Sequence, residues 1–231
     1  MPPILHQYEN ESEYAETAAQ AIENFVAESL KAQRTVTLAL SGGKGPIPVY
    51  KKLVENNRIP WSRVILFLAD ERYAPLNSED SNYHLISTLI ADKVKNLRKF
   101  YSYNTKEPIE TLVHWYDQTL RLQGSPLFDL VILGLGADGH TASLFPGSGA
   151  LQEKRLLVAQ TRPLDLNGLD RMSLTFPAIL DSRKIIFLIR GKEKSKVVDR
   201  WLSGEATVEE LPAVGVLGHK DVEVFYDTSK V

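Results

Sequence analysis

The sequence predicts an α/β fold in which a doubly wound, mostly parallel sheet carries helices on both faces. Short apolar runs alternate along the chain with longer segments of helical periodicity, which is the order that builds βαβ units. These runs are apolar throughout, as in VILFLA at 64–69, and this is typical of parallel strands buried on both faces. No internal repeat, low-complexity tract or linker interrupts the 231 residues. We therefore expect a single α/β domain over 1–231.

The elements of the first half follow from these two patterns. Residues 11–33 place apolar side chains at helical spacing, and Ser12 is the expected N-cap of this helix. TVTLAL and RVILFLA are apolar runs that predict buried strands, and KFYSYN predicts a weaker one. In chain order, we expect a helix at 11–33, a strand at 35–40, a helix at 46–56, a strand at 63–69, a helix at 81–94 and a strand at 99–104.

The second half continues the alternation. FDLVIL, RLLVAQ, KIIFLIR and VEVFYD predict strands, and two segments of helical periodicity lie between them. The signals between about 140 and 175 are short, which suggests a small subregion there. In chain order, we expect a helix at 107–122, strands at 128–133, 155–160 and 184–190, a helix at 192–202 and a strand at 222–227.

The composition excludes several classes of protein. The chain has 27 Lys and Arg against 29 Asp and Glu. It therefore lacks the excess of basic residues that is typical of nucleic-acid-binding proteins. It has no cysteine, which excludes disulfides and thiolate metal sites. The apolar runs are too short to span a bilayer, and the acidic N-terminus does not resemble a secretory signal. We expect a cytoplasmic protein that binds neither membrane nor nucleic acid, and we predict no oligomeric state.

Three loops at the ends of predicted strands are unusually polar. SGGKG (41–45) follows the first strand, DERYAP (70–75) the second, and GLGADGHT (134–141) the strand at 128–133. Ligands of open α/β sheets bind at the carboxyl ends of the strands. The three loops are therefore expected to converge on one site.

The third loop contains G-x-G-x-x-G, the fingerprint of a dinucleotide site. That interpretation requires a packing helix after the third glycine and an acidic residue about 20 positions on. Pro146-Gly147 stops any helix, the next strand ends without a carboxylate, and Asp138 would repel a pyrophosphate. The glycines can also form a simple tight turn with His140 as a capping residue. Because Asp138 is near enough to orient His140, we favour a catalytic histidine.

Other catalytic devices are missing from the sequence. There is no G-x-S-x-G elbow, no H-E-x-x-H, no Walker loop and no cluster with metal-ligand spacing. Gly42 and Gly43 precede a predicted helix, whose free N–H groups and positive dipole end suit a phosphate. The same two glycines can equally form an ordinary strand-to-helix turn.

Five segments together resemble the 6-phosphogluconolactonases: LSGGKGP, LADERYAPLNSEDSNY, GLGADGHTASLFPGS, RMSLTFPAIL and GKEKSKVV. The resemblance implies hydrolysis of 6-phospho-D-glucono-1,5-lactone to 6-phosphogluconate in the pentose phosphate pathway, without metal or organic cofactor. It also implies the fold of glucosamine-6-phosphate deaminases and ribose-5-phosphate isomerases.

The resemblance further implies roles for individual residues. His140 matches the general base, Asp138 an orienting carboxylate, and Arg72 a cation that contacts the substrate. The remaining matches are expected to bind substrate or phosphate: Ser41, Gly42, Gly43, Lys44, Asp70, Arg171 and Lys194.

One departure and two alternatives remain. The family's first loop usually reads S-G-G-S-T-P, whereas this chain has Lys44 and Gly45 in the positions of the Ser and Thr hydroxyls. Lys44 then either contacts the phosphate or points to solvent.

A glucosamine-6-phosphate deaminase would carry an acidic residue soon after His140, and the segment TASLFPG that follows His140 contains none. A sugar-phosphate-sensing domain would need a DNA-binding module, and only one predicted helix precedes the first strand.

Overall fold

A computed structural model describes residues 2–163 and 168–229. These residues form a central sheet of seven strands, and every neighbouring pair is parallel. In spatial order the strands are β1 (Ile4–Tyr8), β10 (Val222–Asp227), β9 (Ser182–Arg190), β6 (Phe128–Leu133), β2 (Val36–Leu40), β3 (Val64–Leu68) and β5 (Lys99–Phe100). The predicted parallel α/β class is confirmed.

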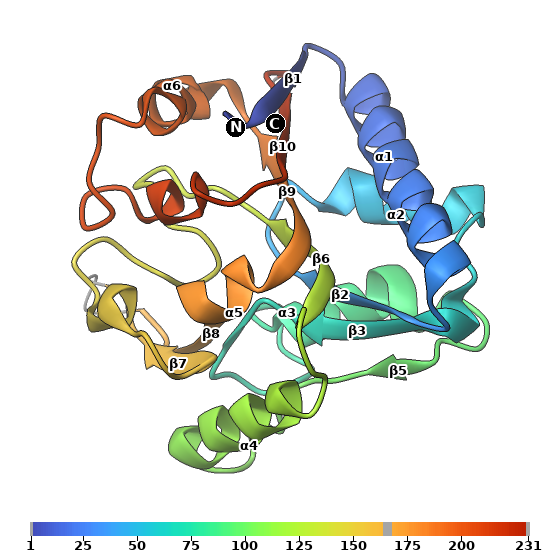
Figure 1. Ribbon diagram of the computed structural model, residues 1–231, viewed down its shortest axis with the longest axis horizontal. Helices are drawn as coiled ribbons and strands as arrows, with labels where there is room; N and C mark the ends of the chain where they lie inside the picture. The colour runs from blue at the N-terminus through green and yellow to red at the C-terminus, as the bar shows by residue number, and fades with distance from the viewer. Residues whose placement is uncertain (1, 164–167, 230–231) are drawn as a thin grey trace.

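Helices cover both faces of this sheet, with α1 and α2 on one side and α5 and α6 on the other (Figure 1). The α-helices are α1 (Glu11–Ala32), α2 (Ile47–Asn56), α3 (Asn82–Ile86), α4 (Ile109–Arg121), α5 (Phe176–Leu180) and α6 (Ser195–Ser203). Short 3-10 turns are η1 (Trp61–Arg63), η3 (Gly149–Gln152), η4 (Lys192–Lys194) and η5 (Pro212–Val216), and η2 (Ser87–Ala91) is a π turn.

The N-cap of α1 is Asn10 rather than the expected Ser12. The Asn10 side chain accepts hydrogen bonds from the backbone N–H groups of Ser12 and Glu13, at 2.8 and 3.1 Å. An N-cap must have extended backbone while its side chain reaches the second and third helical amides. Asn10 meets that condition with φ −137° and ψ 121°, and Ser12 already lies in the first turn.

A second sheet of three antiparallel strands stands beside the first, made of β4 (Asp70–Arg72), β8 (Arg171–Leu174) and β7 (Val158–Thr161). The strand expected at 155–160 is β7, which belongs to this small sheet and not to the parallel one. The connection between β7 and β8 is too short for the crossover that two parallel strands need, so the two strands pair antiparallel. Of the three strands in the small sheet, β7 and β8 fall in the subregion predicted at about 140–175, and β4 lies outside it. Positions 164–167 of that subregion lie outside the described residues.

Other elements also differ from expectation, and β4, β8 and α5 were not predicted. β1 was not predicted, because this edge strand is largely exposed and its apolar residues form no continuous run. The helix expected at 81–94 is α3 followed by the π turn, in which the Asp92 N–H donates to the Ser87 carbonyl. The strand expected at 99–104 pairs only at Lys99–Phe100.

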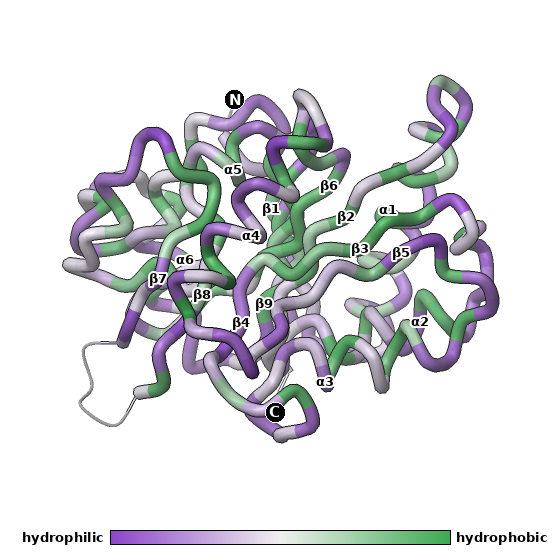
Figure 2. The backbone as a smooth tube through the Cα atoms, turned by 90° about the horizontal axis from the view of Figure 1, so that it is seen from below, coloured by the Kyte–Doolittle hydropathy of each residue, from purple (hydrophilic) through white to green (hydrophobic). Residues whose placement is uncertain are grey.

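The buried apolar residues form one continuous cluster centred on the middle strands. All six residues of β6 are buried, and Figure 2 shows β6, β2 and β3 as hydrophobic. Phe67 of β3 packs edge-on against Phe128 and Tyr116, with ring centroids 5.5 and 6.0 Å apart. No helix among the described residues has the length and apolar character to cross a membrane.

The strand order changes direction between β2 and β6, and this positions the site. From β2 the chain continues to β3 and β5 on one side, then returns to place β6 on the other. Loops that leave two such strands diverge toward opposite faces and open a crevice at their carboxyl ends.

Candidate active site

A cavity of about 200 Å³ lies at the carboxyl ends of β2, β6 and β9. Nine of the ten residues predicted from the sequence line it, and the tenth, Asp138, hydrogen-bonds to one of the nine. The nine are Ser41, Gly42, Gly43, Lys44, Asp70, Arg72, His140, Arg171 and Lys194. The expected convergence of the three polar loops is therefore present in the structure.

The glycine loop, residues 41–45, runs from β2 to the start of α2. Gly43 has φ +86°, a conformation that glycine adopts without steric cost. Gly42 lies so close to Asn82 that an added Cβ would be 2.0 Å from its Oδ1 atom. None of the four amides from Gly42 to Gly45 donates to a backbone or side-chain group in the described part of the chain. These free donors at a helix start suit an anion.

His140 and Asp138 form a hydrogen-bonded pair in the loop after β6. Asp138 Oδ1 lies 2.6 Å from Nδ1 of the imidazole and also accepts the backbone N–H of His140 at 3.2 Å. Partial burial acts to raise the pKa of Asp138. The hydrogen bonds and the charge of His140 outweigh this effect, so the pKa of Asp138 lies below its ordinary value. The carboxylate thus stays ionised and fixes the tautomer that carries its proton on Nδ1.

The glycines of this loop shape the pair rather than a nucleotide site. The Gly136 amide donates to the His140 carbonyl at 2.8 Å, and the Gly139 amide donates to that of Gly136 at 3.0 Å. A Cβ on Gly136 would lie 2.2 Å from His140 Nδ1 and 2.6 Å from Asp138 Oδ1. Turns rather than a helix follow His140. The packing helix that a dinucleotide site requires is therefore not found directly after this loop in the described chain.

Four cations line the cavity, and three of them, Arg72, Arg171 and Lys194, are half-buried. Arg72 and Arg171 are directly opposite each other in the β4–β8 register, and their Nε atoms are buried without a partner among the described residues. Burial lowers the pKa of Arg171, and the neighbouring charge of Arg72 lowers it further. Burial also lowers the pKa of Lys194, whose Nζ donates to the Leu135 carbonyl at 2.6 Å. Cations held together in this way favour a bound anion.

The carboxylates beside these cations, Asp70 and Glu71, accept hydrogen bonds from neighbouring loops and from the start of α3. Asp70 accepts the hydroxyl of Ser143 at 2.6 Å. Glu71, fully buried, accepts the amides of Asn82 and Tyr83 at the start of α3, at 2.7 and 2.8 Å. Burial raises the pKa of Glu71 despite these bonds. Neither group neutralises the arginines by a direct ion pair among the described residues.

Sequence reasoning missed two polar side chains that line the cavity, those of Asn82 and Ser143. Both lie inside segments that carry the resemblance, but neither has a charge or imidazole that would single it out. The Nδ2 of Asn82 donates to the Asp70 carbonyl at 2.9 Å, and its Oδ1 is buried without a partner in the described chain.

The departure at Lys44 and Gly45 has a partial explanation in packing. A Cβ on Gly45 would lie 2.3 Å from the backbone oxygen of Leu188 on β9, so this loop conformation admits only glycine there. Lys44 lines the cavity with an exposed side chain, and its ammonium pairs with no carboxylate of residues 2–163 and 168–229.

The described residues contain no group of three or more His, Asp or Glu side chains placed to hold a metal ion. The sequence-based expectation of metal-independent chemistry stays a prediction.

Comparison with known proteins gives one consistent result. Residues 9–225 match the family described as glucosamine-6-phosphate isomerases/6-phosphogluconolactonase. A 6-phosphogluconolactonase of Thermotoga maritima is 37% identical over 80% of this chain and 82% of its own length. One from Neisseria meningitidis serogroup A is 31% identical over 96% and 98%. The crystal structure of a Thermotoga maritima 6-phosphogluconolactonase superimposes with a TM-score of 0.83 at 32% identity, covering 98% of this chain and 99% of that one.

Proposed function

The chain belongs to the glucosamine-6-phosphate isomerase/6-phosphogluconolactonase family, it is a lactone-hydrolysing enzyme of that family, and we propose that His140 is its general base. The substrate is 6-phospho-D-glucono-1,5-lactone and the product is 6-phospho-D-gluconate. The observation that carries the proposal is the Asp138–His140 hydrogen bond of 2.6 Å, whose imidazole lines a cavity that four cations also line.

The reaction requires one proton to leave water and one to reach the ring oxygen. Asp138 occupies Nδ1 of the imidazole, so Nε2 is the nitrogen available to the substrate. Nε2 takes a proton from water as the water oxygen bonds to C1 of the lactone. The tetrahedral intermediate then breaks its C1–ring oxygen bond, and the imidazolium returns the proton to that oxygen. Such base catalysis contributes about 10²–10⁴-fold, and no covalent intermediate is needed.

We place the phosphate on the free amides of the glycine loop, with Arg171 and Lys194 beside them. Both side chains line the cavity with these amides, and burial lowers both pKa values. A dianion there relieves the repulsion that Arg171 experiences from Arg72. Binding energy at this remote group holds C1 against the base.

Arg72 is proposed to stabilise the oxyanion that develops at C1, together with backbone N–H groups of the loop after β6. Its Nε is buried, lacks a partner among the described residues, and belongs to a side chain that lines the same cavity. One donor of this kind is typically worth about 2.7–4 kcal/mol in the transition state. The cytoplasmic location predicted from the sequence stays a prediction.

The test is lactone disappearance measured with freshly prepared 6-phosphogluconolactone and corrected for spontaneous hydrolysis. His140→Asn is expected to lower kcat by about 10²–10⁴-fold with KM little changed, because the phosphate contacts lie elsewhere. Asp138→Asn is expected to cost less, since it removes orientation and charge but leaves the base. A folded His140→Asn enzyme that keeps more than about a tenth of kcat would mean that His140 is not the base. Ammonia release from glucosamine-6-phosphate, measured in parallel, is expected to be absent.

A further inference from the structure

Two buried tyrosines contact the glycine loop from the core, one at each end. The Tyr50 hydroxyl, on α2, donates to the Ser41 carbonyl at 2.9 Å. The Tyr14 hydroxyl, on α1, donates to the Gly45 carbonyl at 3.0 Å. Both side chains are fully buried. Burial raises both hydroxyl pKa values well above the ordinary value for tyrosine, so both remain protonated donors.

The Tyr50 bond fixes the direction of an amide as well as of a carbonyl. The Ser41 C=O and the Gly42 N–H belong to one planar peptide group and point in opposite directions when the bond is trans. Tyr50 holds the carbonyl on the core side, so the Gly42 N–H points away from the core. Gly42 lines the cavity, and its amide donates to no other group in the described residues.

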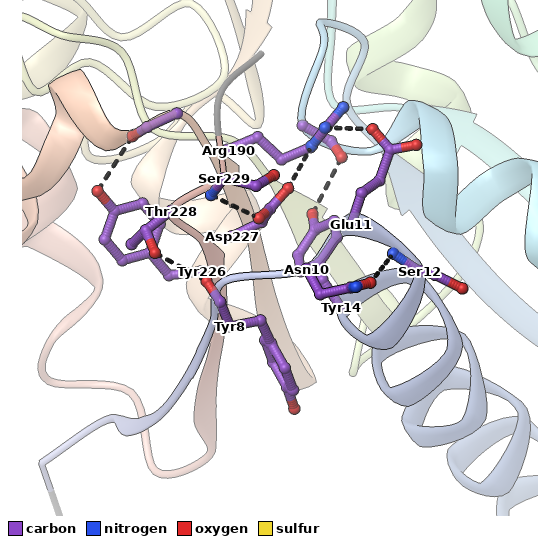
Figure 3. A network of polar contacts seen from close by, with 12 residues as sticks. Tyr8, Asn10, Glu11, Ser12, Tyr14, Arg190, Tyr226, Asp227, Thr228 and Ser229 are labelled. Carbon is purple, nitrogen blue, oxygen red and sulfur yellow. Dashed lines mark hydrogen bonds and ion pairs between the residues drawn. The ribbon is translucent and has the colours of Figure 1, made fainter.

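The Tyr14 bond satisfies the other end of the loop without turning an amide away from the cavity. Pro46 follows Gly45 and has no N–H, so the Gly45 carbonyl can face α1 without loss of a donor. Tyr14 lies beside Arg190, which is paired with Glu11 and with Asp227 (Figure 3). The Arg190–Asp227 contact measures 2.9 Å and joins the ends of β9 and β10, and the pairing of Arg190 with Glu11 joins them to the start of α1.

Orientation matters because glycine peptides rotate easily. Gly43 already has a positive φ, and with no Cβ at Gly42 or Gly43 only small steric barriers oppose a flip of these peptides. A flipped Ser41–Gly42 peptide would present a carbonyl oxygen to the phosphate in place of an N–H. A buried hydroxyl bonded to the carbonyl makes that flip costly, because the hydroxyl would lose its partner.

We propose that Tyr50 and Tyr14 are positioning residues of the glycine loop. Tyr50 keeps the Ser41 carbonyl turned to the core and the Gly42 amide turned to the substrate phosphate, and Tyr14 anchors the Gly45 carbonyl at the other end of the loop. This inference rests on the proposed function, and it adds that phosphate affinity depends on two side chains that the substrate never touches.

The experiment compares Tyr50→Phe and Tyr14→Phe with Tyr116→Phe as the matched control. Tyr116 is equally buried, and its hydroxyl bonds to the backbone of Leu68 on β3, at 2.7 and 3.3 Å, rather than to the glycine loop. Calorimetric titration with inorganic phosphate is expected to show about tenfold weaker binding for Tyr50→Phe and a severalfold loss for Tyr14→Phe. KM for the phosphorylated lactone rises in parallel and kcat changes less than twofold. Turnover of unphosphorylated gluconolactone is unchanged, which a general loss of stability would not produce.

Equal phosphate affinity in all three variants would overturn the inference, and thermal unfolding shows whether each variant is folded. If Tyr50→Phe does not fold, Tyr14→Phe carries the test. Arg171→Ala in the same titration separates this inference from the proposed function. If Arg171→Ala weakens phosphate binding and the tyrosine variants do not, the phosphate site stands and the tyrosine role is wrong. If the wild-type enzyme binds no phosphate at millimolar concentration, the placement of the phosphate fails, and this inference fails with it.

Discussion

Gly136→Ala tests the catalytic pair without altering a catalytic side chain. The added Cβ would lie 2.2 Å from His140 Nδ1 and 2.3 Å from Cε1, whereas ordinary contact begins at 3.4 Å. The imidazole must therefore move by about 1 Å, and Asp138, at 2.6 Å from the same Cβ, must move with it. The backbone itself accepts alanine, because Gly136 is not among the glycines with positive φ.

A displacement of about 1 Å between reacting groups costs on the order of 10²-fold in rate, which corresponds to about 2.7 kcal/mol in activation free energy. We expect this loss in kcat, with KM for the phosphorylated lactone changed less than threefold. The assay is steady-state lactone hydrolysis with the spontaneous rate subtracted. Gly149→Ala is the matched control, because a Cβ there meets nothing within 4 Å and the residue does not line the cavity.

The result that would refute this reasoning is a folded Gly136→Ala enzyme with more than about a third of the wild-type kcat. Such an enzyme would show either that the imidazole acts from a different position or that His140 takes no part in the chemistry. Circular dichroism and the unfolding temperature exclude a trivial loss through misfolding.

The pH profile tests the base directly: a general base must be unprotonated to act, so kcat should fall toward acid pH. The lowered pKa of Asp138 keeps that carboxylate ionised, and a flat profile would contradict the assignment. The phosphorylated lactone should be preferred over plain gluconolactone by at least about a hundredfold in kcat/KM, about 2.7 kcal/mol, and equal turnover would exclude the phosphate site. Lys44→Ala should raise KM about two- to fivefold at low salt and less at high salt, since the side chain is exposed; an unchanged KM would mean that Lys44 faces solvent. Activity should survive an excess of chelator, and its loss with recovery on addition of one divalent ion would contradict metal-independent hydrolysis.

The sequence by itself determined the fold class, most strands and the location of the site. The runs at β2, β3, β6, β9 and β10 are predominantly apolar, because both faces of a parallel strand are covered. The burial of these strands can therefore be predicted from short stretches of sequence. The polar loops that follow β2, β3 and β6 are equally local features. His140 and Asp138 are two positions apart in one loop, which is why their pairing was predictable.

Only the tertiary structure decided which distant groups meet. Arg72 lies opposite Arg171 because β4 and β8 pair antiparallel, and neither three- nor four-residue strand carries a pattern strong enough to predict that register. The contacts of Tyr50 and Tyr14 with the glycine loop, and of Gly45 with β9, depend on how α1, α2 and β9 pack around one core. Periodicity and burial are properties of short segments, whereas a hydrogen bond between segments is fixed by packing, to which the whole chain contributes.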